Sequence, residues 1–301
     1  MSDISLHVLD ELTAELSTSI QKLMNDAANA DGAHPFSESV LIQLRHQSPA
    51  RHVLAYVDDE LAGYAFVEHT EPAPKVELAV APEFRRHGVG HTLLHHIANK
   101  HPNIQLWAHG ENTAAALLAE SEGFHRVRTL FQMRRPLLAA IPEQSLANDI
   151  SLRPFNLTKD LDDWLECNAA AFAQHPEQGG WTERDIHLRM AEEWFDPQGF
   201  MVAHHDNRMI GFYWTKVHDF AHLSSAEPVG EVYICGVIPE FQGQGIGSAL
   251  VVTALKYLRK IGMTSAMLYV DTRDAKTVKL YEKLGFVTWD SDTLYTKDLT
   301  Q

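Results

Sequence analysis

Cysteine is scarce in this sequence, and long apolar runs are missing. The 301 residues include only two cysteines, Cys167 and Cys235, which make neither a disulfide framework nor the paired spacing of a zinc site. No apolar run approaches the ~20 residues that cross a bilayer. The first residues, 1–4, lack the basic and apolar stretches of a secretory leader. We therefore expect a cytoplasmic protein with no membrane partner.

Positive charge is also in short supply. The chain carries 25 Lys and Arg against 40 Asp and Glu, which gives a formal net charge of −15. The acidic excess is shared by both halves, so neither has the basic surface expected of a nucleic-acid binder. Carboxylates in excess are compatible with a cationic amine substrate, but the same excess also keeps many proteins soluble. Charge alone leaves both explanations open.

The 18 histidines do not suggest a metal centre. Pairs such as His95–His96 and His204–His205 are adjacent, so their members do not share one face of a helix. We predict no metal.

What the sequence does contain is an internal repeat. Residues 85–90 read Arg-Arg-His-Gly-Val-Gly and residues 242–247 read Gln-Gly-Gln-Gly-Ile-Gly, so both follow the pattern [RQ]-x-x-G-x-G. Each turn follows an apolar run that ends in proline, Pro82 or Pro239, and precedes an amphipathic helix. Strand, turn and helix in this order aim backbone N–H groups at one point before a helix N-terminus, which suits a pyrophosphate.

Two further pairs of segments keep the same order in the two halves. Residues 4–9 are echoed at 150–155, and residues 112–124 at 272–286. Three ordered matches indicate a duplication. The short polar stretch 141–149 is the predicted linker, so the domains are expected at 1–140 and 150–301. Each half reads as strands and helices of an α/β plan.

The doubled turn, together with a helix that ends in Leu-Tyr-x-x-x-Gly-Phe at 280–286, resembles the GCN5-related N-acetyltransferases (GNAT) over nearly the whole chain. The resemblance implies two tandem domains, each with a mixed central sheet flanked by helices. It also implies acetyl-CoA as co-substrate, with the pyrophosphate on the turn and the pantetheine along a splayed strand. One coenzyme per domain is compatible with the repeat.

The resemblance assigns coenzyme contacts to matching positions of both halves. In the first half these are Leu78, Ala79, Val80, Arg85, Arg86, His87, Gly88, Val89 and Gly90. In the second half they are Cys235, Gly236, Val237, Gln242, Gly243, Gln244, Gly245, Ile246, Gly247, Ser248, Asp274 and Lys279. Asp274 stands where the family often has Asn, and an Asp cannot donate a hydrogen bond as Asn does. The first half keeps Asn112.

Comparison of the halves predicts which one carries the chemistry. Amine acetylation needs a base for the ammonium and benefits from an acid for the departing thiolate. The resemblance gives these roles to Glu231 and Tyr281, whereas aligning the repeats places Pro74 and Ala119 at those positions. The second half is therefore predicted to be catalytic, and the first to bind or support. Without the resemblance, Glu231 would read as a solvated strand end and Tyr281 as a packing residue.

A narrower resemblance within the family concerns the acceptor. Segments 175–181, 214–218 and 231–233 are similar to tandem enzymes that acetylate the cysteinyl amine of desacetylmycothiol. This similarity implies substrate contacts from Glu38, Glu177, Lys216, Glu231 and Tyr269. Two alternatives stay open: a tandem acetyltransferase of another amine, such as an aminoglycoside or a protein N-terminus, and a non-catalytic acetyl-CoA sensor. We expect a monomer, because two fused domains already make the family's pseudo-symmetric contact.

Overall fold

The computed structural model describes residues 3–70, 73–101, 103–175, 178–218 and 228–297. The chain forms two compact units. The first comprises Met1–Phe131, Asp271–Arg273 and Asp290–Gln301, and the second comprises Gln132–Val270 and Asp274–Trp289. Among the described residues, no helix is long and apolar enough to cross a membrane.

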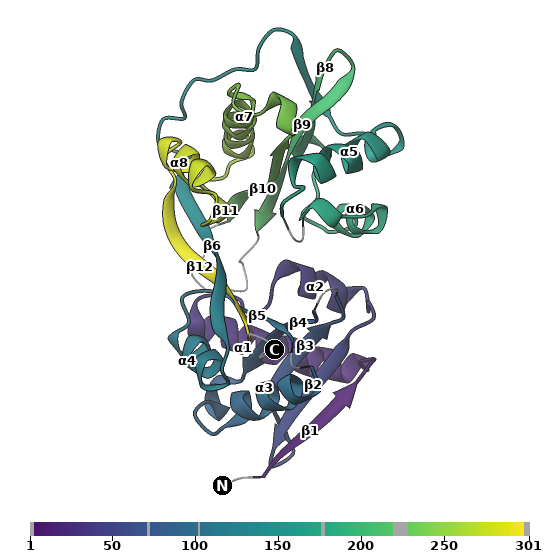
Figure 1. The fold of residues 1–301 in the computed structure, drawn as a ribbon, viewed down its shortest axis with the longest axis vertical. Coiled ribbons are helices and arrows are strands. Elements are labelled where there is room, and N and C mark those ends of the chain that lie inside the picture. The colour runs from purple at the N-terminus through teal and green to yellow at the C-terminus, as the bar shows by residue number, and fades with distance from the viewer. Residues whose placement is uncertain (1–2, 71–72, 102, 176–177, 219–227, 298–301) are drawn as a thin grey trace. The chain divides into compact units, whose positions relative to one another are not determined.

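The first unit is built on a sheet with the strand order β1-β2-β3-β4-β5-β12 (Figure 1). Its elements are β1 (Ile4–Leu9), α1 (Ala14–Asp31), α2 (Glu38–Arg45), β2 (Arg51–Val57), β3 (Glu60–Glu68), β4 (Lys75–Val80), α3 (Val89–Lys100), β5 (Gln105–Ala108), α4 (Thr113–Ser121), the first part of β6 (His125–Pro136) and the last part of β12 (Val287–Thr296), with a short 3-10 turn, η1 (Pro82–Phe84). All of these pairs are antiparallel except β4–β5, so the sheet is mixed.

Each face of this sheet has its own apolar core. On one face, Ile20 and Met24 of α1 pack with Tyr64 and Phe66 of β3. On the other face, α3 supplies the buried side chains Leu93, Leu94 and Ile97, which pack against β2, β3 and β4. Helices on both sides of one mixed sheet match the architecture expected from the sequence.

The second unit repeats this plan with the strand order β6-β11-β10-β9-β8-β7. Its elements are the last part of β6, β7 (Ile150–Pro154), α5 (Leu157–Ala171), η2 (Gln178–Gly180), α6 (Glu183–Met190), η3 (Pro197–Gly199), β8 (Phe200–His205), β9 (Arg208–His218), β10 (Val229–Val237), η4 (Pro239–Phe241), α7 (Ile246–Lys260), β11 (Ser265–Asp271), α8 (Ala275–Lys283) and the start of β12.

The two faces of the second sheet are covered by α7 on one side and by α5 and α6 on the other (Figure 1). Leu250, Leu255 and Leu258 of α7 are fully buried. The opposite face is aromatic: Trp164 of α5 lies 4.9 Å from Phe212, measured between ring centroids, and Phe200 stacks on Trp214 at 4.3 Å. This aromatic face lies beside the residues of the predicted catalytic strand.

The strand that closes each sheet comes from the other half of the sequence. In the first unit, β12 pairs with β5, with Thr293 opposite Ala108 and Tyr295 opposite Leu106. In the second unit, Arg135 of β6 donates a hydrogen bond to the backbone carbonyl of Leu284. The compact units are therefore discontinuous in sequence, although the duplication itself is sequential.

Candidate active site

Both glycine-rich turns have the backbone needed to cradle an anion. Gly88 and Gly245 are the N-cap residues of α3 and α7, with φ of +89° and +82°. A residue with a Cβ is strained in that conformation. Two positions earlier, Gly243 has a φ of +77° and its counterpart Arg86 a φ of +67°. The repeat is thus reproduced in the backbone, and each helix presents its unpaired first-turn N–H groups after such a turn.

The first residue of each turn has a structural role in the cradle. Arg85 Nε donates to the carbonyl of Val80 at 3.2 Å, and Gln242 Nε2 donates to the carbonyl of Val237 at 2.9 Å. These twin bonds tie the turn to the end of the strand before it. Arg85 also forms a bidentate pair with Asp31, at 2.6 and 2.9 Å. Both side chains were predicted coenzyme contacts, and here they hold the turn.

The predicted linker touches the second cradle. Ser248 donates its hydroxyl to Gln144 Oε1 at 2.5 Å, and Gln144 Nε2 donates to the carbonyl of Gly245 at 3.1 Å. Lys256, further along α7, pairs with Glu143 at 2.9 Å. The stretch 141–149 is therefore attached to α7 as well as connecting the repeats.

The strand before each turn separates from its parallel neighbour, as expected. Pairing of β4 with β5 covers Lys75 and Val76, while β4 continues to Val80. Pairing of β10 with β11 ends at Glu231, while β10 continues to Val237. The backbone beyond these points is available to an extended ligand such as a pantetheine arm.

The two splayed strands differ by one residue. The β9–β10 register shifts between Val232 and Ile234, so Tyr233 is an extra residue of β10, whereas β3–β4 pairing runs without a shift. When the extra residue Tyr233 is left out of the count back from Val237 and Val80, the position of Glu231 is matched by Lys75. The sequence alignment, which lacked this bulge, had matched it to Pro74. Neither residue is a carboxylate, so the inference about the second half is unchanged.

Glu231 is a buried carboxylate, only 4% exposed, at the point where the splay begins. Its direct cross-strand neighbour is Lys216, 8% exposed. The diagonal neighbour His218 approaches closest, with Nε2 2.5 Å from Glu231 Oε2. Glu231 thus stands opposite Lys216 in the strand register and contacts His218 directly.

Three aromatic residues near this strand, Trp181, Trp194 and Tyr233, form what we call the aromatic wall. The ammonium of Lys216 lies 5.1 Å from the ring centroid of Trp194 and 5.6 Å from that of Tyr233. Arg189 Nε donates to the Tyr233 hydroxyl at 2.7 Å, and its guanidinium lies 3.9 Å from the Trp181 ring centroid. Cations packed on aromatic rings are stabilised by the ring quadrupole. The sequence analysis assigned no role to Tyr233, Arg189 or His218, although Tyr233 and His218 lie inside segments that it quoted.

Tyr281 lies on α8 in the same unit. Burial is the main cause that raises the pKa of its phenol above its ordinary range, with Cys235 and Asp274 adding to the effect. Burial also raises the pKa of the Cys235 thiol to about 12, so this thiol stays protonated and unreactive. The predicted contact of Cys235 with the coenzyme stays a prediction.

The remaining predicted residues are distributed as follows. Asp274 is the N-cap of α8, where its two oxygens accept from the backbone N–H and the hydroxyl of Thr277 at 3.0 and 2.6 Å. Asn112 caps α4 in the same way. Tyr269 is 40% exposed and accepts a hydrogen bond from Gln132 at 2.9 Å.

Three further predicted contacts lie on other elements or outside the described residues. Lys279 is exposed on α8, and Glu38 is the first residue of α2 in the first unit. Glu177 lies outside the described residues.

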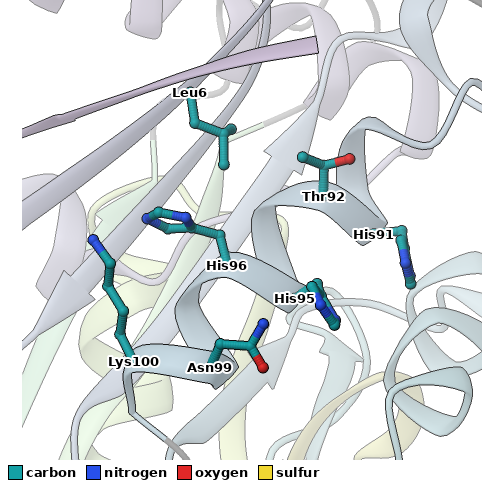
Figure 2. A pocket seen from close by; sticks show the side chains of 7 residues that line it. All are labelled: Leu6, His91, Thr92, His95, His96, Asn99 and Lys100. Atoms are coloured by element: carbon teal, nitrogen blue, oxygen red, sulfur yellow. The ribbon is translucent and has the colours of Figure 1, made fainter.

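One face of α3 carries a pocket and a histidine pair that the sequence analysis did not weigh. The pocket, about 460 Å³, is lined by Leu6 and by residues of α3, and contains none of the predicted site residues (Figure 2). Within the described residues, one group has atoms close enough to hold a metal ion, namely His91, His95 and Glu122.

The two histidines of this group lie one turn apart, with rings stacked at 5.5 Å, and their Nδ1 atoms are 2.7 and 3.3 Å from the Glu122 oxygens. Both imidazoles are more than half exposed, as in ordinary surface pairs with a carboxylate. The prediction that no metal takes part stays a prediction.

Comparison with known proteins identifies the class to which this fold and site belong. The model of the acetyltransferase (GNAT) family matches residues 161–286, and the model of an acetyltransferase (GNAT) domain matches residues 48–126. The chain belongs to the GNAT family and is an N-acetyltransferase with two GNAT domains.

Relatives along nearly the whole chain carry a more particular name. A mycothiol acetyltransferase of Acidothermus cellulolyticus is 46% identical, over 91% of this chain and 88% of the relative. A mycothiol acetyltransferase of Streptomyces coelicolor is 44% identical, over 97% and 94%. The chain is thus similar from end to end to enzymes of that name.

Solved structures agree on the fold. A tandem GNAT protein from the clavulanic acid pathway covers 98% of both chains with a TM-score of 0.74 at 17% identity. A GCN5-related N-acetyltransferase from Sphaerobacter thermophilus covers 97% of this chain and 95% of its own, with a TM-score of 0.68 at 22% identity. These likenesses confirm the tandem arrangement of two such domains.

Proposed function

We propose that the protein transfers the acetyl group of acetyl-CoA to the cysteinyl amine of desacetylmycothiol and so forms mycothiol. The identity of 41–46% with relatives named mycothiol acetyltransferase supports the choice of substrate. The observation that carries the chemistry is the buried Glu231 at the start of the splay and beside the β10 bulge, where the first unit has Lys75 and no bulge.

The residues present fit the co-substrate. The left-handed glycines before α3 and α7 leave their turns open to a pyrophosphate, and the splayed halves of β4 and β10 offer backbone to a pantetheine. In β4, Leu78 and Val80 pack toward the α3 core and Ala79 toward the α1 core, which leaves the strand edge for such a contact. We propose that both units bind acetyl-CoA and that only the second transfers the acetyl group.

Glu231 serves as the base in this reaction. The acceptor is an α-amine with a reference pKa of ~7.7–8.0, so much of it is already neutral near pH 8 and a carboxylate suffices to take the remaining proton. The neutral amine attacks the thioester carbon, which forms the C–N bond directly. A bulge leaves its extra residue outside the hydrogen-bond ladder. Together with the end of β11 pairing at Glu231, this leaves backbone N–H groups on one side of β10, from Tyr233 toward Val237, to stabilise the developing oxyanion, each donor being worth ~10²–10³ in rate.

Tyr281 is the proposed donor to the departing thiolate. Its raised pKa keeps the phenol protonated at every working pH, which favours its availability as a donor. The same shift makes transfer to a thiolate of ordinary pKa ~8.5 more uphill than for a solvated tyrosine. The donor role therefore depends on the thiolate also being desolvated at the moment of transfer. The base role of Glu231 carries no such condition.

The test is acetyl transfer to a panel of amines. Desacetylmycothiol, aminoglycosides and peptides with a free N-terminus are each incubated with acetyl-CoA, and product is counted by mass because desacetylmycothiol carries its own thiol. We expect strong preference for desacetylmycothiol and a ~10²–10⁴-fold loss of kcat in Glu231→Gln. Lys75→Gln, at the matching place in the first unit, is the control and should keep wild-type turnover.

Each other outcome selects another function. Turnover of a different amine would keep the fold and the base but reject the substrate. No turnover of any amine, with acetyl-CoA still bound, would favour a sensor. The cytoplasmic location and the monomeric state stay predictions.

A further inference from the structure

The closest polar contact of Glu231 comes from a residue to which no role has been given. His218 Nε2 lies 2.5 Å from Glu231 Oε2, and the His218 side chain is 19% exposed against 6% for Glu231. A carboxylate only accepts hydrogen bonds, so the imidazole donates its Nε2–H. A hydrogen bond to an ionised carboxylate is charge-assisted and stronger than a bond between neutral groups.

The sheet register explains why this pair forms. His218 stands opposite Val229 and two residues along β9 from Lys216, the partner of Glu231. Side chains two apart on a strand share a face, and diagonal cross-strand neighbours lie within reach of a ring. His218 therefore approaches Glu231 from the end of β9, beside Lys216 rather than in place of it.

The other polar groups near Glu231 contact aromatic rings, and His218 contacts its carboxylate. On β9, Lys216 is packed over Trp194 and Tyr233; on α6, Arg189 is bonded to the Tyr233 hydroxyl. On β11, the residue paired with Glu231 is Met267, which does not titrate, and Tyr269 follows two residues later. Lys216 and Arg189 are thus engaged with the aromatic wall, while the imidazole bonds the carboxylate directly.

We propose that His218 is the positioning residue of Glu231: its Nε2–H holds Oε2 and thereby keeps the carboxylate turned so that Oε1 meets the amine of the acceptor. This inference rests on the proposed base role of Glu231. In the step, the ammonium N–H bond breaks and the proton moves to Oε1, while the bond from His218 to Oε2 is kept. His218 itself gains and loses no proton.

The test compares two replacements of His218. Gln places an amide N–H near the former Nε2 without titrating, and Leu removes the donor. We expect His218→Leu to lower kcat ~10–100-fold with little change in the KM for acetyl-CoA, and to move the low-pH limb of the kcat/KM profile to higher pH. The limb moves because a carboxylate that loses a donor is protonated more readily. His218→Gln should recover most of kcat and the position of the limb.

Two further measurements separate this role from a structural one. If His218 acts through Glu231, the double variant Glu231→Gln with His218→Leu should be no slower than Glu231→Gln alone. Additive losses, or equal losses in the Gln and Leu variants with an unmoved limb, would overturn the proposal.

A readout without substrate keeps the inference separate from the proposed function. The ¹⁵N spectrum of the His218 ring should show the Nε2–H tautomer in the wild-type protein and change in Glu231→Gln. An unchanged ring spectrum would show that the two side chains do not interact and would reject the positioning role. The expected spectrum in a protein that fails to acetylate desacetylmycothiol would reject the substrate and keep the contact.

Discussion

At the scale of the residue, a buried histidine in the sheet of the first unit shows how burial fixes a protonation state. His52 on β2 is 5% exposed, and its Nδ1 lies 2.7 Å from the hydroxyl of Tyr64 on β3. Burial lowers the pKa of His52 to about 4, against the weak opposing effect of Asp10. The neutral imidazole is therefore the form that fits between the strands.

This shift predicts a dependence of stability on pH. The unfolded chain binds a proton at His52 below about pH 6.5, whereas the folded protein does so only near pH 4. The contribution of His52 to stability is complete above pH 6.5 and is lost as the pH falls toward 4, since the unfolded state then binds more protons. Amide exchange of β2 and β3 at pH 7.5, 6 and 5 measures this slope. We expect a shallower slope in His52→Gln; an identical slope would mean that other groups produce it.

At the scale of the element, the two glycine-rich turns and the helices after them have nearly the same structure. Both begin a helix after a left-handed glycine, and both tie the turn to the preceding strand through a side chain, Arg85 or Gln242. The strands beside them differ by the bulge at Tyr233 and by the charge at Glu231. Under the proposed mechanism, pyrophosphate binding therefore depends on the turn and helix that both units share, and acetyl transfer depends on the strand that differs between them.

Matched alanine variants of the two glycines test that separation. A Cβ at Gly88 or Gly245 meets no atom closer than 3.4 Å, so the cost is backbone strain of ~1–2 kcal/mol. That strain corresponds to ~5–30-fold in affinity if coenzyme binding requires the turn. We expect Gly245→Ala to raise the KM for acetyl-CoA, and Gly88→Ala to weaken one of two binding events in calorimetry without changing turnover. Equal effects on turnover would place catalysis in both units.

At the scale of the molecule, the last part of β12 belongs to the first unit, although it follows the whole second repeat in sequence. Asp290 and Asp292 of β12 accept hydrogen bonds from the backbone N–H groups of Glu111 and Gly110, at 2.8 and 3.1 Å. The imidazole of His109 lies 3.0 Å from Asp292 and 3.4 Å from Glu77. Burial disfavours the charged imidazole, but the two carboxylates outweigh it and raise the pKa of His109 well above its usual value.

Breaking this anchor should loosen the first unit in a pH-dependent way. The His109–Asp292 attraction is fully present below the ordinary pKa of histidine and is lost as the pH rises through the raised folded value. The destabilisation caused by Asp292→Asn should therefore be larger at pH 6 than at pH 9, read as faster amide exchange in β5. Deleting residues 290–301 should expose β5 at both pH values. Protection of β5 that survives the deletion would show that β12 does not support the first unit.

The sequence by itself determined the fold class, the duplication and the two cradles, because these depend on local patterns: glycines that permit positive φ, apolar strands that end in proline, and helices with one apolar face. The resemblance to the GNAT family singled out Glu231, and comparison with the other half of the chain assigned the chemistry to the second half. Only the tertiary structure decided that Lys75 is the true counterpart of Glu231, since a one-residue bulge changes strand register without leaving a mark in the sequence.

Contacts between segments far apart in sequence also could not be predicted from local patterns. The contact of His218 with Glu231 depends on how β9 pairs with β10, and the return of β12 to β5 joins segments nearly 190 residues apart. Arg189 reaches Tyr233 from a helix whose sequence carries no sign of that target. Such contacts follow from the folding of the whole chain, which brings together side chains that no spacing rule connects.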